Sequence, residues 1–594
     1  IFTILLADRS TTAIPPPGSA MYGTAEPKIQ ITHGPVLGHP DADSLTLWIR
    51  TSRPTTFNVT FLSEKGAIHK ATGATRLHRD NTGTATITGL QPETRYQYVV
   101  SVPGTQHTAS GSFKTLPEAD GYRHEAYNPE GLFNFSFETA CGNYMNPRDT
   151  RSPAMPAYKT MYENIRKRVD FQIMNGDFIY ENGRGTTVDT WRSEVGINST
   201  ETPAIVEIAP QIVGIWENYK RYYERSPYLR KWHQNVPAFF MFDDHEIRND
   251  INGTGTPGFR DETALLRDIG IQAWYDYVGW SSPIPESRQQ GIVFGKARIN
   301  AGNATLYDSS AQFGRVNPAE RPTLHIHWND GHDNAGVYEI EEILDDHRIK
   351  LHPPPERDAE DLSYSIGRQS YYSFKISNAE FFVLDTRTSR GLHDLDKPDM
   401  EGLSMLGEVQ KNWLIRRMKE STADFLFVVS SVSFTIPHLA PDIENKDESW
   451  TVFLDERKQL MQVWDRLAQP VVLLTGDLHN SIAIDISDNI YEFVSSPHNS
   501  GNHYAYEEGG RPPNGKFTYN NRTVDIKWSS YFKKGTDRTI SNKKFYVVLS
   551  INNVFNNPTQ HHDRWIAYPN PQLVVQYYNG STGKLEYAES IQAN

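Results

Sequence analysis

Short apolar runs alternate with polar stretches along this chain, and four of the runs lead directly into side chains that can bind a metal. Buried parallel strands read as runs of this kind, and ligands bind outside their carboxyl ends. Four such strand ends predict one metal centre assembled from separate parts of the sequence, and hence an enzyme. The four runs are Leu132–Phe137, Phe171–Met174, Phe239–Phe242 and Val471–Thr475.

From about residue 118 onward, strand-like runs alternate with amphipathic helical patterns. Helices are predicted at Ala157–Arg168, Glu408–Ser421 and Asp455–Leu467, and each of them precedes an apolar run. Alternation of strands and helices is typical of a layered α/β core. Residues 118–594 are therefore predicted to form the catalytic domain.

Residues 28–117 follow another pattern, in which short strands of alternating polar and apolar residues are separated by turns. Leu45–Arg50 and Thr56–Phe61 are examples, and the stretch GLQPETRYQYVV resembles the corner before a late strand of fibronectin type III domains. The spacing predicts a fibronectin III or immunoglobulin-like β-sandwich at 28–117. Residues 1–27, with three consecutive prolines, are predicted to be an extended lead-in.

Three further segments interrupt or follow the alternation of strands and helices. Residues 290–375 are rich in glycine, histidine and alternating strand patterns, which predicts a β-rich insertion. Residues 500–542 are polar, basic and rich in glycine and asparagine, which predicts a surface loop region. Residues 543–594 return to strand patterns, and we expect these strands to close the edge of a sheet.

The 594 residues are too many for one small core, so two domains are expected. The net charge of −13 argues against a nucleic-acid partner, although it leaves room for a local basic pocket. Seven Asn-x-Ser/Thr sequons favour a secreted or extracytoplasmic protein. The apolar segment Ile1–Ala7 is either the remnant of a targeting segment or membrane anchor upstream of Ile1, or a first strand. The sequence leaves the oligomeric state open.

Each of the four metal-capable strand ends also has a purely structural interpretation. Asp177 and Tyr180 can belong to a turn, and Asp243–Glu246 can cap a helix. Asp477 and His479 lie at i and i+2, on one side of an extended segment. Cys141, the single cysteine, can be a small buried apolar residue. The structural interpretation would have to hold at all four strand ends together, which favours a shared metal centre.

Five separated motifs, in a fixed order after the β-sandwich, give the chain a specific resemblance over residues 28–500. The motifs are GDFIYE, FDDHE, FFVLDTRTSR, LGEVQKNWL and LLTGDLH. In this set the chain resembles the alkaline phosphatase D (PhoD-like) family of metallophosphoesterases. The resemblance implies a mixed α and β fold, in which the sandwich is followed by a four-layer αββα metallophosphoesterase domain. It also implies Fe³⁺ and Ca²⁺ as cofactors, with other divalent ions able to fill the second site.

The resemblance also implies a role for each residue that matches a motif. Asp177 would bridge the two metal ions, and Arg387 would bind phosphate through its bidentate fork. His245 would contact the phosphate or assist the leaving group. The remaining ligands of the ferric ion would be Cys141, Tyr180 and His479. The remaining ligands of calcium would be Asp244, Asn249 and Asp477.

One departure from the wider metallophosphatase superfamily concerns the first catalytic strand. That superfamily opens with an Asp-x-His motif, whereas this chain has Glu138-Thr139-Ala140-Cys141. The cysteine suits the PhoD-like branch, in which it takes the place of the aspartate. The insertion at 290–375 is not part of the common core, so the substrate class stays open.

The sequence supports three functions for this site. The first is metal-dependent hydrolysis of phosphodiesters, phosphomonoesters or both, with a phosphate ester as the partner of the site. The second is a calcium-dependent phospholipase D acting on lipid headgroups, because the same centre can cleave diesters. The third is a non-catalytic cell-surface binding protein on a degenerate phosphatase fold. No residue of the motifs is replaced by an inert one, which favours an enzyme.

Overall fold

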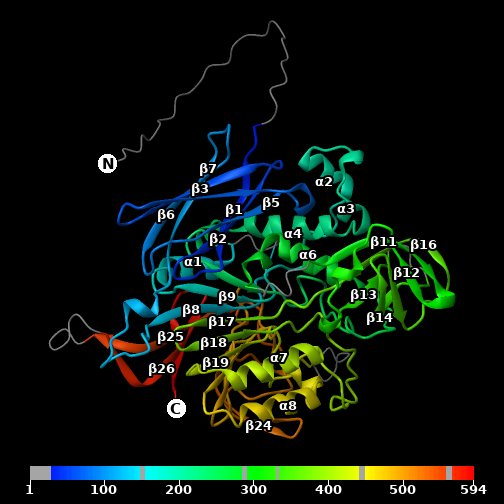
Figure 1. Cartoon of the computed structure of the whole chain (residues 1–594). Coiled ribbons are helices and arrows are strands. Elements are labelled where there is room, and N and C mark those ends of the chain that lie inside the picture. The colour runs from blue at the N-terminus through cyan, green and yellow to red at the C-terminus, as the bar shows by residue number, and fades with distance from the viewer. Residues whose placement is uncertain are drawn as a thin grey trace.

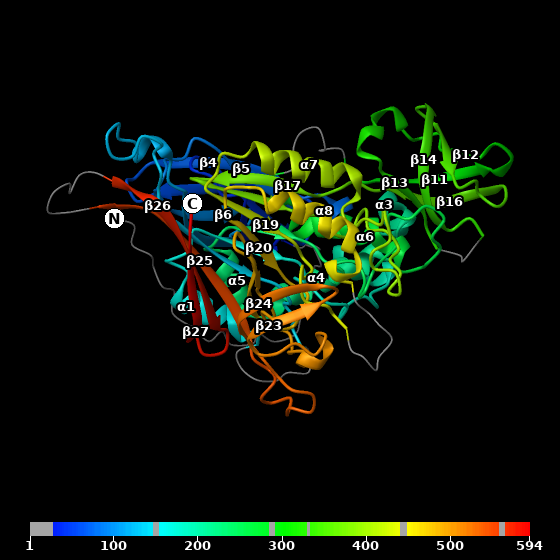
Figure 2. The same cartoon turned by 90° about the horizontal axis from the view of Figure 1, so that it is seen from below.

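The computed structural model describes residues 28–146, 154–283, 291–328, 333–439, 448–556 and 565–593, and Figures 1 and 2 show it from two directions. The lead-in predicted at 1–27 lies outside the described residues. Strands and helices alternate through most of the chain, and the predicted mixed α/β class is confirmed. Within the described residues, no helix combines the length and the apolar character that crossing a membrane requires.

Seven strands near the N-terminus form two sheets with facing apolar sides. Strands β4, β3, β6 and β7 form one sheet in that order, and β1, β2 and β5 lie side by side in the other. Leu47, Phe61 and Tyr98 belong to the apolar cluster between the two sheets. The fibronectin III-like classification of this unit stays a prediction. The strands are β1 Ile31–Gly38, β2 Leu45–Thr51, β3 Thr56–Ser63, β4 Ile68–Ala74, β5 Thr82–Ile87, β6 Arg95–Ser101 and β7 Thr108–Lys114.

A nine-stranded sheet runs through the molecule in the order β27-β26-β25-β8-β9-β10-β1-β2-β5. Strands β8, β9 and β10 are parallel, and β1 joins them through the pair Gly38 and Ala238. The N-terminal strands therefore continue the first catalytic sheet. The C-terminal strands extend its other side, as expected for 543–594. The strands not yet given are β8 Phe135–Ala140, β9 Phe171–Asn175, β10 Ala238–Met241, β25 Phe545–Asn556, β26 Trp565–Asn579 and β27 Leu585–Gln592.

A second sheet of eight strands lies against the first, in the order β17-β18-β19-β20-β22-β21-β24-β23. Strands β18, β19, β20 and β22 are parallel. The ring of Phe137 on β8 lies 5.2 Å from that of Phe381 and 5.5 Å from that of Phe427, so aromatic residues fill the space between the sheets. The strands are β17 Tyr372–Ile376, β18 Ala379–Val383, β19 Phe425–Val429, β20 Val471–Thr475, β21 Ile482–Ser487, β22 Ile490–Val494, β23 Gly515–Tyr519 and β24 Arg522–Ser529.

Helices pack on the outer faces of both sheets, with different helices on each (Figures 1 and 2). Buried residues of α1, α4, α5 and α6 share one apolar cluster with the first sheet, whereas those of α7 and α8 pack on the second. The helices are α1 Pro156–Asn164, α2 Val188–Val195, α3 Ala204–Ile208, α4 Ile212–Arg225, α5 Pro227–His233, α6 Arg267–Tyr277, α7 Gly407–Glu420 and α8 Leu454–Trp464.

The segment predicted as a β-rich insertion contains a closed six-stranded barrel with its own apolar core. The barrel stands at one end of the molecule (Figure 1). It is tied to α6 by Arg267, whose Nη1 donates to Thr323 Oγ1 at 2.6 Å, and by Ser365, which donates to Asp268 Oδ2 at 2.7 Å. The strands are β11 Val293–Asn300, β12 Thr305–Tyr307, β13 Thr323–Ile326, β14 Gly336–Asp345, β15 Arg348–His352 and β16 Ala359–Ile366.

The prediction of a surface loop region at 500–542 is wrong for much of this segment. Strands β23 and β24 extend the second sheet, and Asn502, Glu508 and Arg511 are buried. Arg511 donates to Glu508 at 2.6 Å, and the Asn502 amide donates to the backbone of His479 at 3.1 Å. The polar composition therefore reflects buried hydrogen bonding, which a hydropathy pattern cannot distinguish from exposure.

A buried carboxylate, Asp80, joins the N-terminal strands to the catalytic helices. Its carboxylate accepts hydrogen bonds from Arg50 Nη2 at 3.0 Å, Trp191 Nε1 at 2.7 Å and Tyr277 OH at 2.5 Å. Arg50 lies on β2, whereas Trp191 and Tyr277 lie on α2 and α6. Burial opposes ionisation, but Arg50 and Lys220 outweigh it and lower the pKa of Asp80 to about 2.

Candidate metal centre

The carboxyl ends of the parallel strands of both sheets meet at one edge. Cys141 directly follows β8, Gly176 and Asp177 follow β9, and Asp477 follows β20 after Gly476. The backbone N–H of Asp477 donates to Cys141 Sγ at 3.3 Å, so an end of the first sheet contacts an end of the second. The sequence-predicted strand ends are therefore neighbours in space.

Gly176 and Gly476, at these strand ends, lie where an added side chain would collide with a neighbouring residue. A Cβ on Gly176 would lie 2.6 Å from Asp243 Cβ, and one on Gly476 would lie 2.4 Å from Cys141 Sγ. The aspartate after each glycine has a positive φ, +54° at Asp177 and +64° at Asp477. Such backbone conformations are uncommon outside glycine and gather at functional sites. The turns bring both carboxylates back over the sheet edge.

Asp177 lies at the middle of the centre and is fully buried. Its Oδ2 accepts a hydrogen bond from Tyr180 OH at 3.0 Å. The Tyr180 hydroxyl lies 3.2 Å from His479 Nε2 and accepts from Ser500 Oγ at 2.9 Å. Burial raises the pKa values of the Tyr180 hydroxyl and of the Cys141 thiol, and nearby carboxylates raise both further. A strong cation would therefore be needed to deprotonate either group.

Four aspartates place one carboxylate oxygen each within 4.8 Å of one another: Asp177, Asp243, Asp244 and Asp477. Burial raises the pKa of Asp177 well above its usual value, and burial raises that of Asp244 to about 6. His438 Nδ1 lies 3.5 Å from Asp477 Oδ2, and against the effect of burial it lowers the pKa of Asp477. Mutual repulsion of buried carboxylates is relieved by a metal ion.

Two carboxylate oxygens in this group show that a cation fits. Asp177 Oδ1 and Asp243 Oδ2 are buried and have no hydrogen-bond partner among the described residues. A buried charged oxygen without a partner is costly, so an ion is the natural partner for both atoms. Oxygen ligands suit hard cations such as Ca²⁺, whereas a thiolate and an imidazole suit transition metals. The mixed donor set agrees with two different ions.

Arg387 has surroundings other than those expected of a phosphate ligand. It is fully buried, and its Nε donates to Asp243 Oδ1 at 2.6 Å. Nη1 donates to Glu448, and Nη2 lies 3.9 Å from Asp244 Oδ1. Nε and Nη1 thus donate to carboxylates, Nη2 makes no hydrogen bond among the described residues, and the guanidinium has no exposed surface. Its geometry is that of a group that holds the carboxylates in place.

His245 lies at the outer side of the centre, where 14% of its side chain is exposed. Its Nδ1 lies 2.9 Å from Glu181 Oε2, and its ring centroid lies 3.9 Å from that of Tyr180. Burial lowers the pKa of the imidazole, but the carboxylates of Asp244, Asp177 and Glu181 outweigh it and raise the pKa well above its usual value. Glu181 orients the ring through its hydrogen bond.

Asn249 is exposed, and its backbone N–H donates to Glu181 Oε1 at 2.7 Å. The next residue, Asp250, approaches the centre with its carboxylate. Asp250, Asp244 and Glu448 place one oxygen each within 4.8 Å of one another, and so do Glu448, Asp477 and His438 with one ligand atom each. The structure therefore adds Asp250, Glu448 and His438 to the residues around Asp244 and Asp477, and none of the three was among the predicted calcium ligands.

Three groups of this centre, His438, Glu448 and His503, were missed from the sequence. His438 and Glu448 lie in the long connection after β19, and neither directly follows an apolar run that would predict a strand end. The ring of His503 stacks on that of His479 at 4.5 Å, from the segment predicted as a surface loop. Polar residues in the connections after β19 and β22 could have indicated these groups, because the loops that follow parallel strands lie at the same edge of the sheet.

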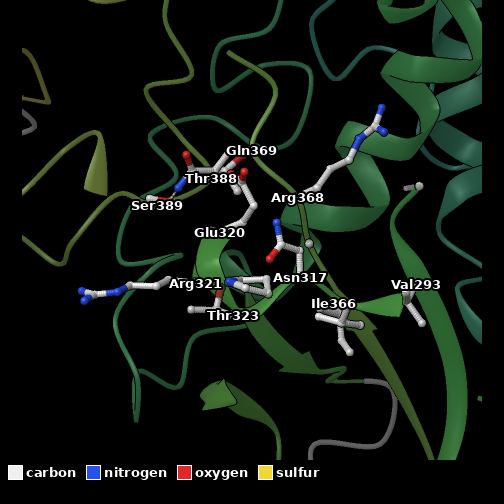
Figure 3. A pocket seen from close by; sticks show the side chains of 14 residues that line it. Val293, Asn317, Glu320, Arg321, Thr323, Ile366, Arg368, Gln369, Thr388 and Ser389 are labelled. Carbon is white, nitrogen blue, oxygen red and sulfur yellow. Dashed lines mark hydrogen bonds between the residues drawn. The ribbon is translucent and has the colours of Figure 1, made fainter. Parts of the chain in front are cut away.

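A separate cavity, drawn in Figure 3, lies at the root of the barrel. Its volume of about 60 Å³ holds a few water molecules, much less than a pocket for a small-molecule ligand needs. Figure 3 shows Arg321 and Arg368 extending away from Glu320 and Gln369. Although Thr388 in its lining directly follows Arg387, the cavity is distinct from the carboxylate cluster.

The layered α/β fold gathers buried acidic residues that could hold a metal ion at one sheet edge. The model of the PhoD-like phosphatase family matches residues 135–307 and 354–544, more than half of the chain. The chain therefore belongs to the PhoD-like phosphatase family. The family model passes over residues 308–353, which contain β13, β14 and β15 of the barrel. A second model, a domain of unknown function (DUF7800), matches residues 28–118.

A solved structure of PhoD shows the same architecture at low sequence identity. A structure of PhoD is 17% identical with a TM-score of 0.56, and the match covers 94% of this chain and 90% of that one. Purple acid phosphatase PPD1 from yellow lupin (Lupinus luteus) is 11% identical with a TM-score of 0.49, over 94% of this chain and 74% of that one. No curated protein matches the chain. At this identity, the likeness to PhoD shows the fold alone.

Proposed function

We propose that this protein hydrolyses phosphate esters at a centre of Fe³⁺ and Ca²⁺, with Asp177 shared by the two ions. Membership of the PhoD-like phosphatase family supports metal-dependent phosphoesterase activity in general. The observation that most supports a shared role for Asp177 is that its two carboxylate oxygens have different surroundings. Asp177 Oδ2 accepts from Tyr180, whereas Oδ1 has no hydrogen-bond partner among the described residues, and the residue is a member of the aspartate cluster.

The proposed ligands divide into two sets around Asp177. The thiol of Cys141, the phenol of Tyr180 and the imidazole of His479 suit the ferric ion, because Fe³⁺ stabilises tyrosinate and thiolate. The carboxylates of Asp244 and Asp477 suit calcium. Asn249 is also a proposed calcium ligand. Asp250 and Glu448 are proposed as further oxygen donors to calcium, because their carboxylates lie close to that of Asp244.

When bound, the two ions would supply clamping of phosphate oxygens and activation of the attacking water. His245 is placed to give a proton to the leaving alkoxide, because it lies at the exposed rim of the cluster and Glu181 fixes its Nδ1. Arg387 positions Asp243, Asp244 and Glu448 by its buried contacts. Preorganised charge of this kind is usually the largest part of catalysis.

Replacing Tyr180 by phenylalanine tests the ferric assignment. A tyrosinate bound to Fe³⁺ colours a protein, so wild-type protein should absorb visible light and the variant should lose that band. Tyr144 is a matched control, because its ring packs 5.1 Å from that of Tyr180. The Tyr144→Phe variant should keep the band. Equal spectra for both variants, at equal iron content by elemental analysis, would remove Tyr180 from the ligand set.

Kinetics on a phosphomonoester, a phosphodiester and a phospholipid define the ester class. The proposed acid role of His245 predicts a further dependence on the leaving group. A His245→Gln variant should lose about 10²- to 10⁴-fold in kcat on an alkyl ester, whose leaving alkoxide needs a proton. The loss should be much smaller on a nitrophenyl ester, whose leaving group is stable as an anion. An equal loss on both esters would assign His245 to binding instead.

A further inference from the structure

A groove of about 540 Å³ lies between the N-terminal strands and the turn that joins α1 to β9. One wall comes from β6 and β7, and the other from residues 166–170. This volume is in the range of pockets that bind small molecules. Its five cationic lining residues are Arg95, Lys114, Arg166, Lys167 and Arg168.

The positive charge of the groove is unusual for a chain with a net charge of −13. Arg95 on β6 is directly opposite Lys114 on β7, and like charges at such positions destabilise a sheet. Lys114 is paired with Glu93 at 3.0 Å. Arg95 and Lys167 have no carboxylate within ion-pair distance among the described residues. Two walls from different parts of the chain thus concentrate uncompensated charge.

Helix capping explains part of this charge but not all of it. Residues 166–168 follow the C-terminus of α1, where cations complement the helix dipole. Arg95 lies on the facing wall, far from that helix end in the sequence, and its charge has no such role. The single carboxylate in the lining, Asp170, is occupied at Oδ2, which accepts from the backbone N–H of Ser136 at 2.9 Å.

The β6 and β7 wall of the groove is fixed to the residues that follow α5, independently of any ligand. Ser112 Oγ donates to Asn235 Oδ1 at 2.9 Å, and Tyr98 OH donates to the backbone oxygen of Gln234 at 2.9 Å. The groove adjoins the start of β9 at Phe171, whereas Asp177 follows the other end of that strand. It is therefore preformed and separate from the metal centre.

The lining favours a chain of phosphate groups over a nucleic acid. Single-stranded nucleic acids bind through aromatic side chains on which their bases stack. In this groove Phe113 is buried, and the ring of Tyr162 already has the Arg166 guanidinium at 4.3 Å. A phosphate chain needs cations alone. We propose that this groove binds a short, multiply charged phosphate chain at a site separate from the metal centre.

Binding of inorganic tripolyphosphate, measured by titration calorimetry on metal-loaded protein, tests this assignment. At about 5 Å in a water-like dielectric, one pair of unit charges is equivalent to roughly 4-fold in affinity. A triple variant, Arg95→Gln/Arg166→Gln/Lys167→Gln, should therefore bind tripolyphosphate about 60-fold more weakly at the groove. The affinity of wild-type protein should also fall as salt rises.

Two further variants distinguish binding in the groove from an effect of net charge and from binding at the metal centre. A triple variant at exposed lysines elsewhere, Lys65→Gln/Lys419→Gln/Lys533→Gln, changes the net charge equally and should keep the affinity. Asp177→Asn impairs the metal centre and should keep the groove's binding, so failure of the proposed activity is distinguishable from failure of this inference. The single variant Lys167→Gln should bind about 4-fold more weakly even if the triple variant does not fold.

Three results would overturn the inference. The first is equal affinity in wild-type protein and in the folded groove variant. The second is an equal loss in the surface-lysine variant, which would reduce the effect to net charge. The third is binding of a single-stranded RNA oligonucleotide through the groove more tightly than tripolyphosphate, which would replace the phosphate chain by a nucleic acid.

Discussion

Replacing Arg387 by glutamine distinguishes two possible roles of this residue, which are to position carboxylates and to bind phosphate. The guanidinium donates to Asp243 at 2.6 Å and to Glu448, and all three side chains are buried. Breaking a buried ion pair from one side costs about 3–5 kcal/mol, because it leaves the partner charge uncompensated. We therefore expect Arg387→Gln to lower the free energy of unfolding by about that amount, measured by denaturant unfolding.

The same variant should change phosphate affinity little. Loss of one charged hydrogen bond to a bound phosphate, at about 1.5–3 kcal/mol, would raise the inhibition constant of inorganic phosphate about 10- to 150-fold. A positioning role predicts a rise below about 3-fold, with the main loss in kcat, because Arg387 contacts carboxylates and not solvent.

A core variant of similar instability controls for general loss of structure. Leu426 is fully buried on β19, and Leu426→Ala should cost about 2–5 kcal/mol while leaving kcat near the wild-type value. If Arg387→Gln unfolds at the wild-type denaturant concentration but binds phosphate more than 10-fold more weakly, the positioning role is refuted. Arg387 would then be a phosphate ligand, as the sequence motif implies.

Contacts elsewhere lead us to expect measurable changes in acid stability and in metal binding. Because the pKa of Asp80 falls from 3.8 to about 2 on folding, its contribution of roughly 2 kcal/mol is present above pH 4 and lost as pH falls through 2. Asp80→Asn should flatten this acid dependence in denaturant unfolding, and an unchanged pH profile would contradict the role of the Arg50 pair. Gly476→Ala should weaken metal binding at least 10-fold, measured by metal titration, because its Cβ would meet Cys141 at 2.4 Å. Gly501→Ala, with open space around its Cβ, should bind metal as the wild type does.

The strand ends were predictable because two physical signals coincide there. Apolar runs mark buried parallel strands. Gly176 permits the tight turn that returns the Asp177 carboxylate to the edge, and Gly476, before Asp477, leaves room for Cys141. The order of the motifs then indicated the family, which the family model confirmed. The helix predicted at Ala157–Arg168 ends earlier, at Asn164, because the following basic residues form a turn before β9.

The contacts of Arg387, Glu448 and His438 could not be predicted, because they depend on the direction in which each side chain points. Nothing in the sequence distinguishes an arginine facing substrate from one facing carboxylates, and Arg387 faces Asp243 and Glu448. Glu448 and His438 reach the centre from a long connection, without the periodicity that marks a strand or helix. The continuity of the N-terminal strands with the first sheet rests on one backbone pairing, Gly38 with Ala238, which has no local signature.

The geometry of the centre is built largely by a carboxylate at its inner side. Glu246 accepts backbone N–H groups from Asp177 at 3.1 Å, Phe178 at 2.6 Å and Asp243 at 2.8 Å. It thereby ties the ends of β9 and β10 together and holds the positive φ of Asp177. Asn175 links the two sheets in the same way, since its amide donates to the backbone oxygens of Ser430 at 2.7 Å and Leu474 at 3.1 Å. These contacts need no metal, so the folded chain brings the proposed ligands together in advance, and bound ions would neutralise charge that the fold has already gathered.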